Sequence, residues 1–120
     1  MNKGRKITGG KYHANRKKKL FERPGQERVV TLKETKRKTL RITGGNKKTI
    51  LLNADEANII VNGKAKKTKI KNVLETPHNL FHARQNRLTK GTVIMTSEGK
   101  ARITNRPSQE GHVNAILVKE

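Results

Sequence analysis

Short apolar runs separated by glycine and asparagine make up the chain from Val29 onward. The runs are rich in Val, Ile, Leu and Thr, which favour the pleated, half-buried surface of a β-strand. The expected strands cover residues 29–32, 39–42, 49–52, 57–61, 69–74, 92–96, 101–104 and 113–118. The pattern predicts an all-β fold, a small β-barrel of about six to eight short strands.

Three connections contain residues that favour turns. Asn62-Gly63 can supply the two positive φ angles of a hairpin turn, and Glu98-Gly99 lies between two strand-like runs. The segment Gly44-Gly45-Asn46-Lys47-Lys48-Thr49 resembles the end of a nucleotide-binding loop, but it lacks the glycine directly before Lys-Thr. We interpret it as a glycine turn flanked by phosphate-binding lysines, with a plain exposed hairpin as the alternative.

Alternation along residues 39–42 predicts which of their side chains are buried. Successive side chains of a strand point to opposite faces, so Leu40 and Ile42 should face the core, while Thr39 and Arg41 should face solvent. The Arg41 guanidinium is therefore expected on the wet face of the barrel.

At most one short helix is expected, in the third quarter of the chain. Thr76-Pro77 could provide its N-cap and first helical residue, and Leu80, Arg84 and Leu88 recur every four residues before Gly91 ends the pattern. A structured loop packed on a partner would have nearly the same sequence, so both alternatives remain open.

Residues 1–28 show neither a helical nor a strand period, because their few apolar side chains are scattered among Lys, Arg, Gly and Asn. We interpret them as an extended basic tail and residues 29–120 as the β-barrel domain. Such a tail buries too little apolar surface to offset its ordering entropy, so it should stay disordered until a polyanion supplies phosphates along it. Gly9-Gly10 would let its backbone turn sharply and approach a phosphate, or would act only as a flexible joint.

Charge indicates the class of partner. The 120 residues contain 29 Lys and Arg against 9 Asp and Glu, a net charge of +20, and residues 1–48 carry +14 of it. Nucleic-acid phosphates would neutralise this excess and release their condensed counterions. No apolar run exceeds the four residues 115–118, so no membrane role is expected. The chain has no cysteine and no apolar segment after its charged start, which predicts a cytoplasmic protein without disulfides.

The sequence offers no credible catalytic or metal site. Asp55-Glu56 is the only acidic pair, and we interpret it as a solvated turn, since adjacent carboxylates seldom converge on one atom. His78 and His82 have a spacing that could hold a metal on a helix, but no carboxylate or thiol nearby completes a ligand set. Ser97 and Ser108 lack a nucleophile-elbow context. We therefore expect no enzymatic activity, no cofactor, no metal and no small-molecule substrate.

Basic clusters are the candidate binding residues. Hydrophobic residues are only 31% of the chain, and its aromatic residues are Tyr12, Phe21 and Phe81, too few for a platform on which bases stack. Recognition of the shape and backbone of folded RNA by Arg and Lys is the mode that remains. The expected RNA-binding residues are Lys3, Arg5, Lys6, Gly9, Gly10, Lys11, Arg16, Lys17, Lys18, Lys19, Arg23, Arg37, Lys38, Arg41, Lys47, Lys48, Arg84, Arg87, Lys90 and Arg106.

Four ordered segments resemble the small-subunit ribosomal protein family numbered eight, of the type shared by archaea and eukaryotes. They are Gly4 to Lys11 with the following Arg16 to Lys19, then Gly44 to Lys47, Leu88 to Gly91 and Thr104 to Gly111. The resemblance spans almost the whole chain, whose compact length looks like the archaeal form. It implies a β-barrel with an N-terminal extension, laid against small-subunit ribosomal RNA among neighbouring ribosomal proteins, without catalytic residues or a cofactor.

Two other functions remain as alternatives. A DNA-compacting, chromatin-like protein would need the same charge, and sedimentation with the nucleoid rather than with ribosomal subunits would indicate it. An enzyme acting on RNA would need the same basic surface, and cleavage or modification of RNA by the purified protein would indicate it.

Overall fold

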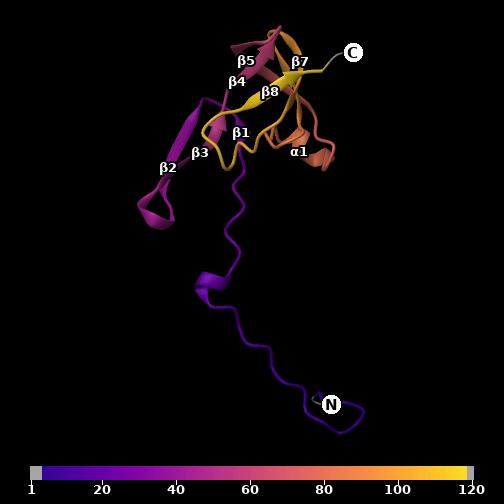
Figure 1. Ribbon diagram of the computed structural model, residues 1–120. Helices are drawn as coiled ribbons and strands as arrows, with labels where there is room; N and C mark the ends of the chain where they lie inside the picture. Colours follow the sequence, from indigo (N-terminus) through magenta and orange to yellow (C-terminus); the bar gives the residue numbers. More distant parts are fainter. Residues whose placement is uncertain (1–3, 119–120) are drawn as a thin grey trace.

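Two β-sheets and a long N-terminal extension make up the computed structural model, which describes residues 4–118 (Figure 1). The strands are β1 (Thr31–Leu32), β2 (Lys36–Arg41), β3 (Lys47–Ala54), β4 (Glu56–Val61), β5 (Lys64–Glu75), β6 (Val93–Thr96), β7 (Gly99–Ile103) and β8 (Asn114–Leu117). The helical elements are α1 (Leu80–Arg84) and the single 3-10 turns η1 (Leu20–Glu22) and η2 (Thr43–Gly45). Within these residues, the expected all-β barrel fold with at most one short α-helix is confirmed.

Five strands close the barrel, in the order β4-β5-β6-β7-β8. Neighbouring strands are antiparallel, except that β4 and β8 close the barrel by parallel pairing. The 12 residues of β5 change register between Ile70 and Asn72, and such a bulge lets one long strand curve around a small barrel. The core is aliphatic, as the composition requires: Ile59, Ile94 and Ile103 are 0–1% exposed.

The other three strands form a separate sheet in the order β1-β3-β2. The antiparallel strands β2 and β3 project from the barrel as a hairpin (Figure 1). Leu51 of β3 is part of the buried core, whereas the far end of the hairpin lies away from it. Leu40 is half-buried, but Ile42 is 43% exposed, so the prediction that Ile42 is buried is wrong. Arg41 does face solvent, but on the hairpin rather than on the barrel.

The hairpin turn predicted at Asn62-Gly63 is confirmed, because both residues have positive φ angles, 50° and 76°, between the paired ends of β4 and β5. The second hairpin joins β6 and β7, and its turn lies one residue earlier than expected, at Ser97-Glu98. Gly99 is already the first residue of β7 and has a φ of 121°.

The segment between β5 and β6 is a structured loop that contains one short helix, so each of the two alternatives describes part of it. The start predicted at Thr76-Pro77 is wrong: the N-cap of α1 is Asn79, whose Oδ1 accepts a hydrogen bond from the Phe81 N–H at 3.0 Å. Thr76 is fully buried instead. Within residues 4–118, no helix has the length and apolar character needed to cross a membrane.

The N-terminal extension leads away from both sheets (Figure 1), and every residue from 4 to 29 is exposed. The radius of gyration of the Cα atoms is 21.1 Å and the longest dimension is 70 Å, whereas a compact chain of this length has a radius of gyration of about 14 Å. Val30 is the first buried residue of the described chain. The extension therefore lengthens the molecule and adds nothing to its buried core.

Candidate nucleic-acid interface

Cations lie at close intervals along the exposed extension. Within the described residues, Lys11, Lys17, Lys18 and Arg23 have neither a hydrogen bond nor an ion pair with another side chain. Lys3 was also expected to bind RNA and lies outside the described residues. An extended backbone presents successive side chains to solvent on both sides, so these cations are open to an external anion.

The far end of the extension folds back on itself in a small loop between Gly4 and Lys11. The Lys6 N–H donates to the Gly10 carbonyl at 2.9 Å, and the Arg5 guanidinium donates to the Gly9 carbonyl at 3.0 Å. Gly9 has a φ of 80°, a conformation that residues with a Cβ rarely adopt. The sharp turn expected at Gly9-Gly10 is therefore present, and its approach to a phosphate stays a prediction.

A second local structure forms where η1 interrupts the extension. The Glu22 carboxylate accepts hydrogen bonds from the Arg16 guanidinium at 2.7 Å and from the Lys19 N–H at 3.0 Å. These two contacts hold the pKa of the Glu22 carboxyl below its usual value, so it stays ionised. One of the expected RNA-binding cations, Arg16, thus has an internal partner at the protein surface.

The β2–β3 hairpin carries the second group of cations. Lys38, Arg41 and Lys47 are exposed and have no polar side-chain partner in the described chain. Arg37 and Lys48 differ, because their side chains reach the loop between β7 and β8. The Arg37 Nε donates to the Gly111 carbonyl at 2.7 Å, and the Lys48 ammonium donates to the Gln109 side chain. These two residues attach the hairpin to the barrel.

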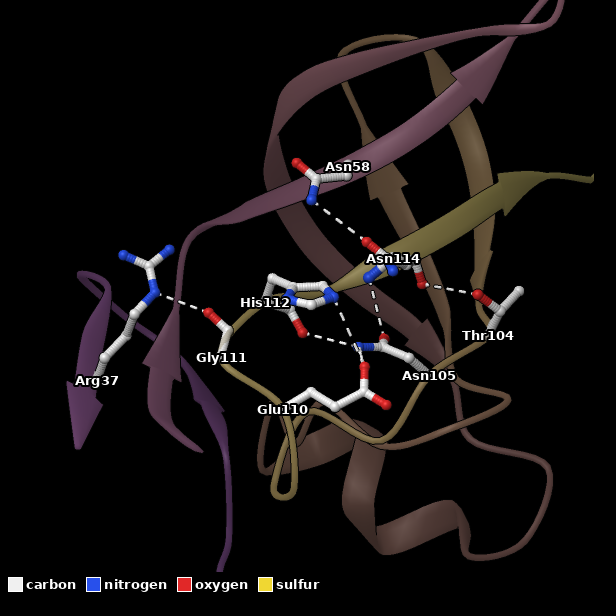
Figure 2. A network of polar contacts seen from close by, with 8 residues as sticks. All are labelled: Arg37, Asn58, Thr104, Asn105, Glu110, Gly111, His112 and Asn114. Atoms are coloured by element: carbon white, nitrogen blue, oxygen red, sulfur yellow. Dashed lines mark hydrogen bonds and ion pairs between the residues drawn. The ribbon is translucent and has the colours of Figure 1, made fainter. Parts of the chain in front are cut away.

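That loop, residues 104–113, is itself held by a network of polar contacts (Figure 2). The Asn105 amide is at its centre: it donates to the Glu110 carboxylate at 2.7 Å and to the His112 carbonyl at 2.8 Å, and its oxygen accepts from the Asn114 N–H at 2.9 Å. The Asn114 side chain in turn accepts from Asn58 of β4 at 3.2 Å. The loop is thereby fixed to the barrel.

The remaining expected cations lie near α1. The guanidinium of Arg84 lies 5.9 Å from the centre of the Phe81 ring. Arg87 lies 3.3 Å from the His82 ring and 3.8 Å from the Glu27 carboxylate, so it has internal partners. Lys90 and Arg106 line one hollow together with Arg28, a residue that sequence reasoning did not select.

Aromatic side chains lie at three separate places, each beside a cation. Lys6 lies 5.8 Å from the Tyr12 ring centre and Lys19 lies 5.9 Å from that of Phe21, both in the extension, while Phe81 is on α1. All three rings are exposed. Tyr12 and Phe21 are in the extension, which leads away from α1 with its Phe81 (Figure 1), so the three rings do not form one platform for successive stacked bases.

The acidic and histidine residues considered as possible catalytic or metal sites make contacts within the protein instead. Asp55 is half-buried rather than a solvated turn: its carboxylate accepts a hydrogen bond from the Thr35 hydroxyl, which lowers the pKa of Asp55. His78 and His82 lie with ring nitrogens 3.3 Å apart. Within residues 4–118, no group of three or more His, Asp or Glu is placed to hold a metal.

Comparison with known proteins places the chain in one family. The family model described as ribosomal protein S8e matches residues 1–118. Small ribosomal subunit protein eS8 of Methanocorpusculum labreanum is 44% identical over 117 residues, which cover 96% of this chain and 94% of the relative. The protein of the same name from Sulfolobus acidocaldarius is 44% identical over 123 residues, covering 99% and 95%. Because both the family model and these relatives match nearly from end to end, the chain belongs to the ribosomal protein S8e family.

Proposed function

We propose that the chain is a structural constituent of the small ribosomal subunit, where it binds and braces ribosomal RNA beside neighbouring ribosomal proteins. Residues 1–28 act as the RNA-binding tail, and residues 29–120 act as the barrel domain. The assignment to the small subunit is supported by the names of the relatives. On this proposal the protein works in the cytoplasm, as part of the ribosome, and catalyses no reaction.

One observation carries the proposal: residues 4–29, a stretch of 26 residues without a single buried side chain, hold nine basic and two acidic residues. Ordering each backbone residue costs about 1–2 kcal/mol at room temperature. An extension that buries nothing cannot recover this free energy from its own contacts, so a partner has to supply it. RNA phosphates match the charge of the extension, and their counterions are released on binding.

The exposed cations favour contacts to the RNA backbone over the reading of bases. Arginine forks bind phosphate oxygens in pairs, and lysine ammonium groups act as point charges. The tail and the β2–β3 hairpin both project from the barrel (Figure 1), so one protein molecule can reach phosphates that lie far apart. The polar network of residues 104–114 keeps the hairpin and the barrel in one arrangement, which lets the folded part act as a rigid spacer.

The test is a comparison of polyanions of equal length. Purified full-length protein is titrated at fixed salt with a fragment of small-subunit ribosomal RNA, with a fragment of large-subunit ribosomal RNA and with duplex DNA. We expect the tightest binding to the small-subunit fragment. Equal affinity for duplex DNA would contradict the proposal and would support the DNA-compacting alternative, and release of shorter RNA products during the titration would support an enzyme.

A further inference from the structure

A hollow of about 410 Å³ lies where the root of the tail meets two loops of the barrel. Its walls come from four parts of the chain: Arg28 at the root of the tail, His78 before α1, residues 88–90 before β6, and residues 106–108 between β7 and β8. Sites for small ligands have volumes of about 300–1,000 Å³. The hollow is therefore large enough for one small polar ligand.

The lining of the hollow is cationic and has unused donors. Arg28, Lys90 and Arg106 all line it, and no acidic residue does. In the described chain, none of these three side chains has a hydrogen bond or an ion pair. Three cations that lack a partner and lie around one cavity repel each other, and the negative charge of a phosphate group would reduce this repulsion.

The floor of the hollow is apolar, which a site for phosphate alone would not need. Leu88 and Pro107 lie beneath it, and both are almost completely buried, with Leu88 only 1% exposed. Thr89 and Ser108 also line the hollow, and the Thr89 hydroxyl lies 3.2 Å from the His78 Nε2 and 2.9 Å from the Thr92 hydroxyl. Such a mixture of charge, hydroxyl groups and apolar surface matches a ligand that has a phosphate, a sugar and a flat ring.

One wall is the His78 ring, and its neighbours hold it in a defined state. The Asn79 Oδ1 accepts from Phe81, so its amide nitrogen faces the His82 Nε2 at 3.3 Å, and the Arg87 guanidinium donates to the same atom at 3.3 Å. With two donors facing it, the His82 Nε2 has to be an acceptor, which places the proton on Nδ1. That proton is donated to the His78 Nε2 at 3.3 Å. The His78 ring is therefore fixed, and a fixed imidazole can stack on a base.

We propose that this hollow holds a single unpaired nucleotide of the RNA, with its phosphate bound by Arg28, Lys90 and Arg106 and its base packed on His78. The inference rests on the proposed function, because it takes RNA as the partner. It adds a site for one extruded nucleotide at the barrel, separate from the phosphate contacts of the tail.

The first experiment follows amide and ring signals of the isotope-labelled full-length protein by NMR. The probes are each ribonucleoside monophosphate and inorganic phosphate at constant ionic strength. We expect the nucleotides to shift the signals of His78, Thr89, Lys90 and Ser108, and to bind about tenfold more tightly than inorganic phosphate, because base stacking adds to the phosphate contact. Equal affinity for inorganic phosphate would overturn the proposal.

A second pair of probes separates a nucleotide of RNA from a free nucleotide. One is an RNA hairpin with a single bulged nucleotide, and the other is the same hairpin fully paired. The bulged hairpin should shift the signals of the hollow, and the paired one should not. If both hairpins shift them equally, or if free nucleotides bind while the bulge has no effect, the proposal fails.

Variants identify the groups. Arg106→Gln should weaken the binding of both the nucleotide and the bulged hairpin about three- to tenfold. Arg102→Gln removes an equal charge from the exposed face of β7 and should leave both affinities unchanged. His78→Ala should abolish the preference for nucleotide over phosphate, and His78→Phe, which keeps a flat ring, should restore part of it. An unchanged preference in His78→Ala would contradict the role given to the ring.

The experiments distinguish a failure of the nucleotide-site proposal from a failure of the proposed function. Replacing Lys17, Lys18 and Lys19 with Gln should weaken binding of ribosomal RNA and leave nucleotide binding in the hollow unchanged. If ribosomal RNA is preferred but the hollow stays empty, only the present inference falls. If neither ribosomal RNA nor the bulged hairpin binds, the proposed function falls as well.

Discussion

At the scale of single residues, Gly111 is a position where the loop packs tightly against the hairpin. A Cβ atom at Gly111 would lie 2.9 Å from the Thr49 Cγ2 on β3, and the branched Thr49 side chain in a strand has little freedom to move. We predict that Gly111→Ala lowers the free energy of unfolding by about 1–3 kcal/mol in a urea titration. Gly25→Ala is the control, because nothing lies within 4 Å of a Cβ there. Equal midpoints for the two variants would contradict the close contact.

Asp55 provides a prediction about pH. The Thr35 hydroxyl lowers the pKa of Asp55 in the folded protein, so this hydrogen bond stabilises the fold above the unfolded pKa, and the stabilisation is lost as the pH falls through the folded pKa. Thr35→Val should therefore reduce the free energy of unfolding at neutral pH, and the difference from the parent protein should shrink in acid. Thr39→Val, at an exposed position of β2, should show no such dependence on pH. A difference for Thr35→Val that stays constant with pH would rule out the Asp55 carboxylate as its cause.

The residues that sequence reasoning placed differently have partners far away in the chain. Arg37 reaches Gly111 across 74 positions and Lys48 reaches Gln109 across 61. Both were predicted to bind RNA, which stays a prediction, and in the structure each side chain donates to a neutral acceptor of the protein itself. The same holds for Asp55, which Thr35 contacts from 20 positions away. Sequence patterns report short distances along the chain, so such contacts are not visible in them.

At the scale of elements, the strands could be predicted because each combines a β-branched composition with turn residues at its ends. All eight observed strands overlap an expected one. The pairing could not be predicted, since it depends on which strands meet: three of the eight leave the barrel and form their own sheet. The start of α1 was also misplaced, because Thr76-Pro77 has the residues of an N-cap, but Asn79 makes the capping contact.

Asn79 gives a prediction for the helix. Its side-chain oxygen is the acceptor for the Phe81 N–H, so Asn79→Ala should leave that donor without its partner and weaken the helix by about 1 kcal/mol. Asn79→Ser keeps an oxygen at the cap and should retain most of this stabilisation. Hydrogen exchange at the Phe81 amide measures the difference. Exchange at the same rate in the Ala and Ser variants would show that the cap does not hold the helix.

At the scale of the whole molecule, charge and burial divide the chain in the same way. The first 48 residues carry +14 of the net charge of +20, and the exposed tail supplies much of it. The remaining residues supply nearly the entire buried core, from Ile50 on, with Val30 as the exception. Sequence composition was sufficient to predict this difference in charge and burial between the two segments, because charge density and lack of apolar period are properties of the segment itself. That the tail binds RNA stays a prediction. The grouping of cations around the hollow near Arg28 could not be predicted from composition, because it depends on the fold.

The most direct test of the central claim, that tail cations contact RNA phosphates, is the salt dependence of binding to the small-subunit RNA fragment. Each neutralised phosphate contributes about 0.7–0.9 to the slope of log affinity against log salt. Replacing Lys17, Lys18 and Lys19 with Gln should therefore reduce the slope by about 2–3. The same change at Lys64, Lys69 and Lys71, which are exposed on β5, removes equal charge from the barrel and should leave the slope unchanged. Equal slopes for the two triple variants would contradict the account.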